Sequence, residues 1–432
     1  MYQELRCAAC HRWTPPGEAD EYPRLSLALV GSKFQPGELA RYLAQPHAHY
    51  ASNRMPDFRL STTEAQALAH YLLDRQTAEL AEWTGELVGD AARGRATWVT
   101  LGCQSCHQGP EAADAIVPRA APLKSLVRFE LGCLSTKEPA SADDLRRSPR
   151  YAWSDEDREA VIAWLRRAEA AARRGEAARP AEPGEAAESA LRRWQCGACH
   201  ERDAEQVARL DALLEEGDGR PPELLPNLTW AGEKLKQEWV VGLLRGEHPE
   251  RSRPWLRARM PAFPQAAEIV ATGLAQQHGM PPDDPPPPPR DAPLWDLGQR
   301  LTQPTGLDCG QCHGIGAQQP RGDERTQIAL GINLALTRNR LRGEFFQRFA
   351  LDPPRYDIRT KMPRLATDGR RTKVADILDG DAARQFRAIW HYLQYLPDAG
   401  QGKMRATKVD ASDPTETHSK GELSPVEAIP VP

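Results

Sequence analysis

One short pattern, Cys-x-x-Cys-His, occurs four times in this chain of 432 residues and divides it at nearly regular intervals. The first cysteines of consecutive patterns are 96, 93 and 113 residues apart, and eight of the nine cysteines belong to the patterns. The four sets are Cys7, Cys10 and His11; Cys103, Cys106 and His107; Cys196, Cys199 and His200; Cys309, Cys312 and His313. The spacing indicates an internal repeat with one small domain per pattern, and we call the repeated units copies one to four.

The pattern is typical of covalent c-type haem attachment. Two thiols three residues apart lie on one turn and can each bond a vinyl-derived carbon, while the next residue presents its imidazole to the iron. A structural zinc site would pair two such motifs about 15 to 20 residues apart, and a thioredoxin-like pair would not explain four following histidines. We therefore expect four covalently attached haem c groups, each with its iron.

A second repeated element, a basic residue followed by Met and Pro, comes after three of the patterns. It occurs as Arg54-Met55-Pro56, Arg259-Met260-Pro261 and Lys361-Met362-Pro363, with Met 44, 60 and 49 residues after the histidine. Proline restrains the residue before it to extended backbone, so each Met is expected on a loop that aims its thioether at iron. The alternative is that these methionines only fill core space.

Copy two lacks this methionine. Aligned without gaps, Arg147-Ser148-Pro149 stands where the other copies have a basic residue, Met and Pro, and no Met or further His lies between His107 and His200. Three arrangements are open for the sixth position of this iron. It is open or water-bound; it is filled by Cys133, Lys124 or Lys137; or it takes a histidine from another copy. The histidines considered are His47, His49, His248 and His278.

Amphipathic periodicity around the motifs predicts an all-α fold. Helices are expected before the patterns at 91–101, 188–195 and 294–301, and again after the Met-Pro loops. Ser61 with Glu64 predicts a capping box for a helix over 62–73, and Ser154 with Asp157 predicts one for 158–167. Each copy is thus expected to run helix, haem motif, loop, helix.

The arrangement resembles the class I c-type cytochromes, and the resemblance covers nearly the whole chain apart from linkers and tail. It implies that each pattern's histidine is the proximal ligand and that Met55, Met260 and Met362 are distal ligands. It also implies first and last helices that cross through a glycine and an aromatic residue, and a proline carbonyl that accepts from the proximal histidine. The candidates are Gly94 and Gly298 with Tyr71, Trp164 and Tyr392 for the crossing, and Pro23, Pro122 and Pro226 for the carbonyl.

The expected organisation is four tandem cytochrome c-like domains joined by Pro/Ala-rich linkers. The domains are 1–78, 84–170, 188–280 and 290–398, and a disordered tail covers 399–432. The linker at 171–188 is rich in Ala, Arg, Glu and Pro, and the one at 281–289 contains five consecutive prolines and should be stiff. Only six residues precede Cys7, too few for a first helix, so we expect a missing N-terminal segment or a fusion.

Charge excludes some functions. Lys and Arg number 56 against 60 Asp and Glu, so nothing draws the chain to nucleic acid or anionic membranes, and no apolar stretch is long enough to span a bilayer. Repeated basic residues are expected either to neutralise haem propionates or to be solvated; they are Arg54, Arg147, Arg259 and Lys361, with Lys33, Lys234 and Arg340 upstream.

The resemblance implies an extracytoplasmic, periplasmic-type location, because covalent haem is attached there in this family. The expected function is a multihaem cytochrome that carries single electrons between redox protein donors and acceptors in a respiratory or redox chain. One alternative is a haem enzyme, peroxidase-like or a sulfur-compound oxidoreductase, with copy two as its reactive centre and the other haems as wiring. Another is an electron-input module of a larger dehydrogenase.

Overall fold

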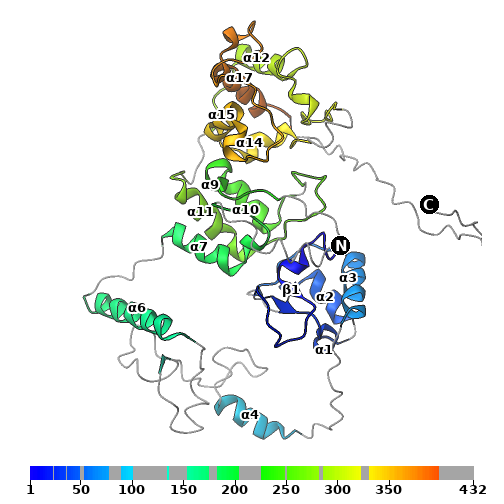
Figure 1. The fold of residues 1–432 in the computed structure, drawn as a ribbon, viewed down its shortest axis with the longest axis vertical. Helices are drawn as coiled ribbons and strands as arrows, with labels where there is room; N and C mark the ends of the chain where they lie inside the picture. Colours follow the sequence, from blue (N-terminus) through cyan, green and yellow to red (C-terminus); the bar gives the residue numbers. More distant parts are fainter. Residues whose placement is uncertain are drawn as a thin grey trace, which may run out of the picture. The chain divides into compact units, whose positions relative to one another are not determined.

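The computed structural model describes residues 1–22, 24–35, 37–48, 53–76, 89–100, 134–135, 153–174, 182–203, 225–248, 251–281, 286–322 and 330–397 (Figure 1). The chain forms two compact units, one of Met1–Ala78 with Glu182–Pro432 and one of Glu79–Ala181. The described residues are mainly helical, and their named strands have two residues each, as the all-α prediction requires. None of the described helices combines the length and apolar character needed to cross a bilayer.

Copy one, in the first unit, packs two helices beside its Cys-x-x-Cys-His turn. Its elements are η1 (Cys7–Ala9), β1 (His11–Arg12), β2 (Leu25–Ser26), α1 (Val30–Lys33), α2 (Glu38–Ala44) and α3 (Thr62–Asp74). The predicted capping box is confirmed, because the Glu64 N–H donates to Ser61 Oγ at 3.3 Å and the Ser61 N–H donates to Glu64 Oε2 at 2.9 Å. Leucines of α2 and α3 then form one apolar cluster with the turn.

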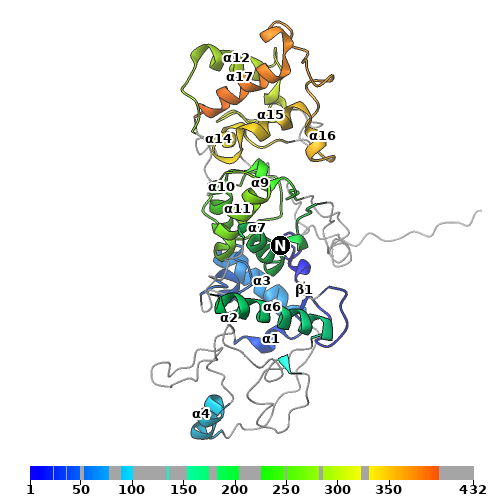
Figure 2. The ribbon, with the colours of Figure 1, turned by 90° about the vertical axis from the view of Figure 1, so that its left-hand side faces the viewer.

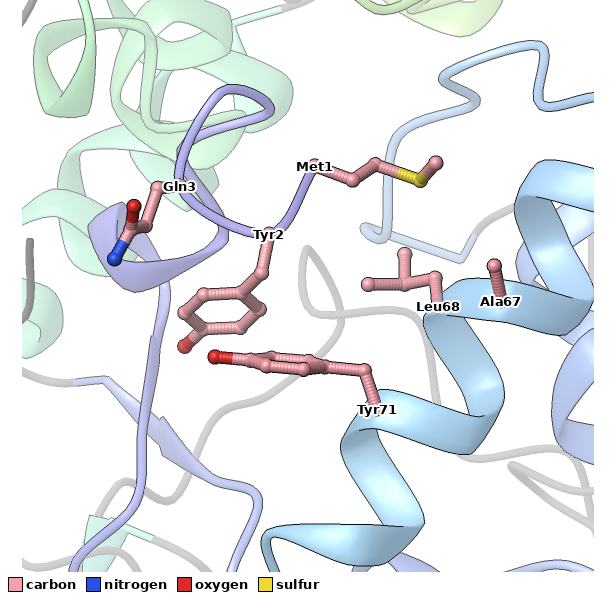
Figure 3. A pocket seen from close by; sticks show the side chains of 6 residues that line it. All are labelled: Met1, Tyr2, Gln3, Ala67, Leu68 and Tyr71. Atoms are coloured by element: carbon pink, nitrogen blue, oxygen red, sulfur yellow. The ribbon is translucent and has the colours of Figure 1, made fainter. Parts of the chain in front are cut away.

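The residues before Cys7 have no helix and cover α3 with side chains instead. Tyr2 is 5% exposed, and its ring lies 5.6 Å from that of Tyr71. A pocket of about 280 Å³ opens here between the segment and α3 (Figure 3). Its lining is Met1, Tyr2, Gln3, Ala67, Leu68 and Tyr71, which includes none of the predicted iron ligands.

Copy three is built on the contact between its first and last helices. Its elements are α7 (Pro183–Arg193), η5 (Cys196–Ala198), α9 (Ala231–Lys234), α10 (Gln237–Arg245), η6 (Pro264–Ala266) and α11 (Ala267–Gln277). A Cβ on Gly273 of α11 would lie 2.2 Å from Ala187 Cβ, so the two helices meet at a glycine. The first helix begins at Pro183 and not at 188, because a proline fits the first helical position. The predicted linker at 171–188 is therefore too long at this end.

Copy four shows the predicted glycine and aromatic crossing. Its elements are α12 (Ala292–Thr302), η7 (Cys309–Gln311), η8 (Leu334–Leu336), α14 (Thr337–Arg340), α15 (Gly343–Leu351), α16 (Pro353–Tyr356), η9 (Leu378–Gly380) and α17 (Ala382–Gln394). Helices α12 and α17 lie side by side in both views (Figures 1 and 2). A Cβ on Gly298 would lie 2.1 Å from Ala388 O and 2.7 Å from Tyr392 Cβ, so only glycine allows this approach.

The second unit contains α4 (Ala91–Thr100) and α6 (Asp155–Arg173). Ser154 accepts from the Asp157 N–H at 3.0 Å, so α6 begins directly after this cap, three residues before the predicted 158. It also continues through Arg173, past the predicted linker start at 171. The expected crossing is not formed by the described residues, since no described atom lies within 4 Å of a Cβ on Gly94 and Trp164 is 64% exposed.

Several predicted positions lie outside the described residues. In copy two they are Cys103, Cys106, His107, Pro122, Lys124, Cys133, Lys137, Arg147 and Ser148. Elsewhere they are Pro23, His49 and the tail at 399–432.

Candidate functional site

The three described Cys-x-x-Cys-His segments share one backbone conformation. The residue before the first cysteine is left-handed in each, with φ of 57° at Arg6, 54° at Gln195 and 56° at Asp308. A 3₁₀ turn follows, in which the N–H of the second cysteine donates to the carbonyl of the first at 3.0, 3.1 and 3.3 Å. Left-handed backbone is uncommon for residues other than glycine. Its repetition directly before the first cysteine of three patterns therefore indicates that the turn requires this conformation.

The cysteines in these turns form no disulfide bonds. Burial raises the pKa of Cys7 to about 12 and the pKa of Cys196 and Cys309 to about 11. Redox-active Cys-x-x-Cys pairs need a lowered thiol pKa. The thioredoxin-like alternative is therefore disfavoured, while two thiols on one enclosed turn suit covalent attachment.

The histidines after the turns are held neutral by their surroundings. Burial lowers the pKa of His11, His200 and His313. His200 Nδ1 lies 2.8 Å from the Pro226 carbonyl, which is the acceptor expected from the sequence, and His313 Nδ1 lies 2.7 Å from the Ile332 carbonyl. Donation from Nδ1 leaves Nε2 with its lone pair, which is what a metal-ligating imidazole needs.

The position of this carbonyl follows from backbone register and not from a proline. In each copy, the residue two positions after this carbonyl donates its N–H, at 2.8 Å, to the carbonyl of the residue that follows the histidine. The donors are Leu27, Leu228 and Leu334. By this register the carbonyl facing His11 belongs to Leu25. Burial lowers the pKa of His11, and the Leu25 backbone raises it by a smaller amount. Nδ1 of His11 makes no hydrogen bond of normal geometry within the described residues.

Two of the predicted methionines pack against the same apolar cluster as cysteines of their own copy. Met55 joins the apolar cluster that contains Cys7 and Cys10, and Met260 joins the cluster that contains Cys196. Met362 is half-buried, but it is not among the residues packed against copy four's cluster, in which Cys309 takes part. In copies one and three, a predicted methionine thus packs against the same apolar cluster as cysteines of the Cys-x-x-Cys-His turn.

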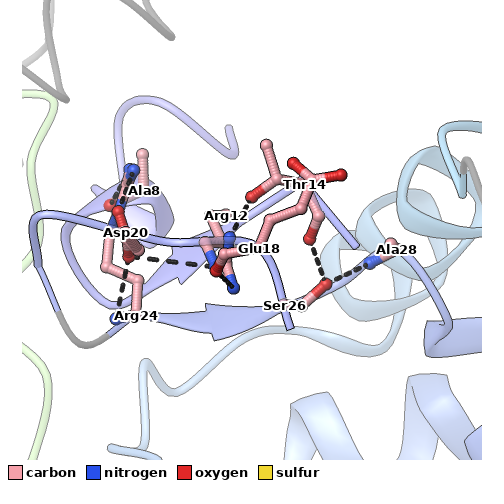
Figure 4. Close-up of polar contacts among 8 residues, drawn as sticks. All are labelled: Ala8, Arg12, Thr14, Glu18, Asp20, Arg24, Ser26 and Ala28. Carbon is pink, nitrogen blue, oxygen red and sulfur yellow. Dashed lines mark hydrogen bonds and ion pairs between the residues drawn. The ribbon is translucent and has the colours of Figure 1, made fainter. Parts of the chain in front are cut away.

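A polar network fixes the loop after His11 in copy one (Figure 4). Arg24 forms an ion pair with Asp20 at 3.0 Å and donates from Nη1 to the Ala8 carbonyl within the Cys-x-x-Cys-His turn at 3.4 Å. The Arg24 contact lowers the pKa of Asp20 to about 2. The loop is therefore tied directly to the backbone that presents the two thiols.

Two of the repeated basic residues, the half-buried Lys234 and the buried Arg340, lie where copies three and four meet. Burial lowers the pKa of Lys234 to about 7 and that of Arg340 to about 9, and Arg253 adds repulsion at both. Arg340 Nε has no hydrogen-bond partner in the described part of the chain. Enclosed cations are costly without anions, and the carboxylates of a haem would supply them. The positive charges of Lys234 and Arg340 are therefore compatible with a haem whose carboxylates lie beside them.

The other repeated basic residues differ. Arg54, Lys33 and Lys361 are exposed, and Arg259 forms an ion pair with Glu64. The sequence alone could not separate Lys33 from Lys234 and Arg340, because the register of the three is the same and only packing differs.

The remaining candidate histidine ligands in the described residues have structural contacts. His47 Nε2 lies 3.1 Å from the Asn53 carbonyl, and His248 Nε2 lies 2.9 Å from the Trp239 carbonyl. His278 packs 6.1 Å from the Trp230 ring.

The chain matches no protein-family model, no curated protein and no solved structure. In the described ranges, no group of three or more His, Cys, Asp and Glu side chains is placed to hold a metal ion.

Proposed function

We propose that this chain is a multihaem c-type cytochrome that carries single electrons between redox proteins outside the cytoplasm. The observation that carries the proposal is the repeated Cys-x-x-Cys-His turn: a left-handed residue, a 3₁₀ turn with two cysteines that form no disulfide, and a half-buried histidine with a lowered pKa. Three segments far apart in the sequence adopt this arrangement, and a zinc or dithiol function would not require it.

Each group would be tethered through the paired cysteines of its copy and held by the histidine that follows them. Haem iron supplies a one-electron couple, and a methionine ligand opposite histidine raises its reduction potential. The chain's own contribution is to keep its ligands in place. Pro226 and Ile332 fix the orientation of His200 and His313, and Lys234 and Arg340 offer positive charge to carboxylates.

The test is a count of attached groups in matured protein. A reduced pyridine haemochrome spectrum with intact mass should give four haems per chain, with no free thiols in the four patterns. Protein that is colourless, or that carries zinc on unmodified thiols, would refute the proposal.

A second candidate, a haem enzyme centred on copy two, is favoured by one observation: Ser148 stands where the other copies have the methionine. An iron without that ligand is open to small molecules. Carbon monoxide binding to one high-spin haem of the four would support the enzyme, and four low-spin haems that do not bind it would leave only the carrier.

A further inference from the structure

The attachment turns of copies one and three contact each other. Cys10 Sγ lies 3.4 Å from Oε1 of Gln195, the residue directly before Cys196. Ala198, 4% exposed, is buried in the apolar cluster of copy one together with Ala8 and Ala9. Two turns almost 190 residues apart in the sequence therefore share one packed surface, and none of the described residues of copy two belongs to this cluster.

Cys10 of the first pattern faces Gln195, the residue that directly precedes the third pattern. The Met-Pro loops repeat this relationship. Asp57 and Ala262, each two residues after its methionine, form an antiparallel bridge with N–H to carbonyl distances of 3.3 and 2.8 Å. Equivalent parts thus meet equivalent parts, as across a two-fold axis.

Polar contacts strengthen the same interface. Arg259 of copy three forms an ion pair with Glu64 of copy one, and Arg59 Nη1 donates to the Gly246 carbonyl at 2.9 Å. Burial of alanines together with this pairing indicates a specific surface and not a chance approach.

The residues inside the patterns explain why these two turns can meet. Copy one has Ala8 and Ala9 between its cysteines, and copy three has Gly197 and Ala198. Copy four has Gln311, which is exposed, and copy two has Gln104 and Ser105. Small side chains occur in the two patterns that touch, where a longer side chain would push the turns apart.

We propose that copies one and three form one redox pair, in which an electron passes directly between their two haems without using copy two. The inference rests on the proposed function. In the step, one ferrous iron becomes ferric and the other ferric iron becomes ferrous, with no proton or further reactant. The cysteines that would tether the two groups lie on touching turns, so the redox order differs from the chain order.

The main test compares two substitutions in the full, matured chain. Ala198→Gln installs the residue type that copy four has at this position, so the pattern should still accept haem while the turns separate. We expect four haems by intact mass and slower redistribution of electrons after pulsed reduction. Gln311→Ala, the reverse change in copy four, should leave the redistribution as in the unmodified chain. Unchanged redistribution in Ala198→Gln would overturn the pairing.

Two further variants address proximity and route. Gln195→Glu should lower the midpoint potentials of two haems, since the carboxylate faces the tethers of both copies, whereas Asp308→Asn at the same register of copy four should raise one. A shift of a single haem in Gln195→Glu would contradict the contact. Cys103→Ala with Cys106→Ala removes the haem of copy two, and direct exchange should persist. Its loss would show that electrons pass through copy two. A chain without haem would instead refute the proposed function.

Discussion

Leu235 and Leu341 form an antiparallel bridge, and each directly follows the short helix of its copy, α9 or α14. On either side of this bridge, the Lys236 N–H donates to the Arg340 carbonyl at 3.0 Å and the Arg342 N–H donates to the Lys234 carbonyl at 3.1 Å. Copies three and four therefore also pair through equivalent segments. Because the pairing is reciprocal, the repeated basic residue of each copy is brought to the same enclosed place.

Replacement of Lys234 tests this enclosed positive charge. Lys234→Met removes a cation beside the expected carboxylates while keeping an apolar stem of similar length. Less positive charge near the irons favours their ferric state, so we expect the midpoint potentials of the haems in copies three and four to fall in a potentiometric titration.

The matched control for this substitution is Lys33→Met, since Lys33 has the same register in copy one but is exposed. Solvent screens an exposed charge, so its potential should change less. Equal shifts in both variants would show that the burial of Lys234 has no electrostatic consequence.

The helix crossing in copy four gives a stability prediction. Gly298→Ala places a Cβ against the Ala388 carbonyl at 2.1 Å, and separating α12 from α17 should destabilise the copy by about 1–3 kcal/mol or more. Thermal unfolding would measure the change. Gly94→Ala on α4 is the control, because no described atom lies near its Cβ and alanine favours helix by about 1 kcal/mol. A neutral Gly298→Ala would mean that the helices are not closely packed.

The sequence predicts those parts of the structure that depend on residues close together in the chain. Ser61 and Glu64 are three residues apart, and their cap forms as expected. Pro183 also indicates the start of α7, since proline favours the first helical position. The composition of the segment, however, indicates a linker.

Other features had no local signal. The acceptor for His313 is the carbonyl of Ile332, and every residue has a carbonyl, so no side chain marks it. The contacts of Arg259 with Glu64 and of Cys10 with Gln195 join residues more than 180 positions apart. From the sequence alone, none of these residues can be distinguished from a residue that is exposed to solvent.

The ion pair between copies one and three has a pH signature. Arg259 lowers the pKa of Glu64 to about 2 from an ordinary 4.5. A carboxylate with a lowered pKa stabilises the fold above its unfolded value, and this stability is lost as pH falls from about 4.5 towards 2.

Glu64→Gln keeps the helix cap and removes the charge. We expect a loss of about 1 kcal/mol at pH 7, limited by partial exposure, and a weaker decline of stability in acid, both followed by denaturant unfolding. Glu38→Gln, which breaks an exposed pair with Arg41, should change stability by a few tenths of a kcal/mol. If both variants showed the same acid profile, Glu64 would not be paired across the interface in solution.

The methionine ligands can be tested with a control inside copy three. Met260→Leu keeps the apolar volume against the cluster of copy three but removes the sulfur, so one iron should become high-spin and bind carbon monoxide, with a lower midpoint potential. Met280→Leu changes a second methionine that also precedes a proline but lies after α11, outside the repeated basic-Met-Pro element, and it should leave all haems as they were. Carbon monoxide binding induced by Met280→Leu and not by Met260→Leu would reassign the ligand, because both substitutions remove the same sulfur chemistry and differ only in position.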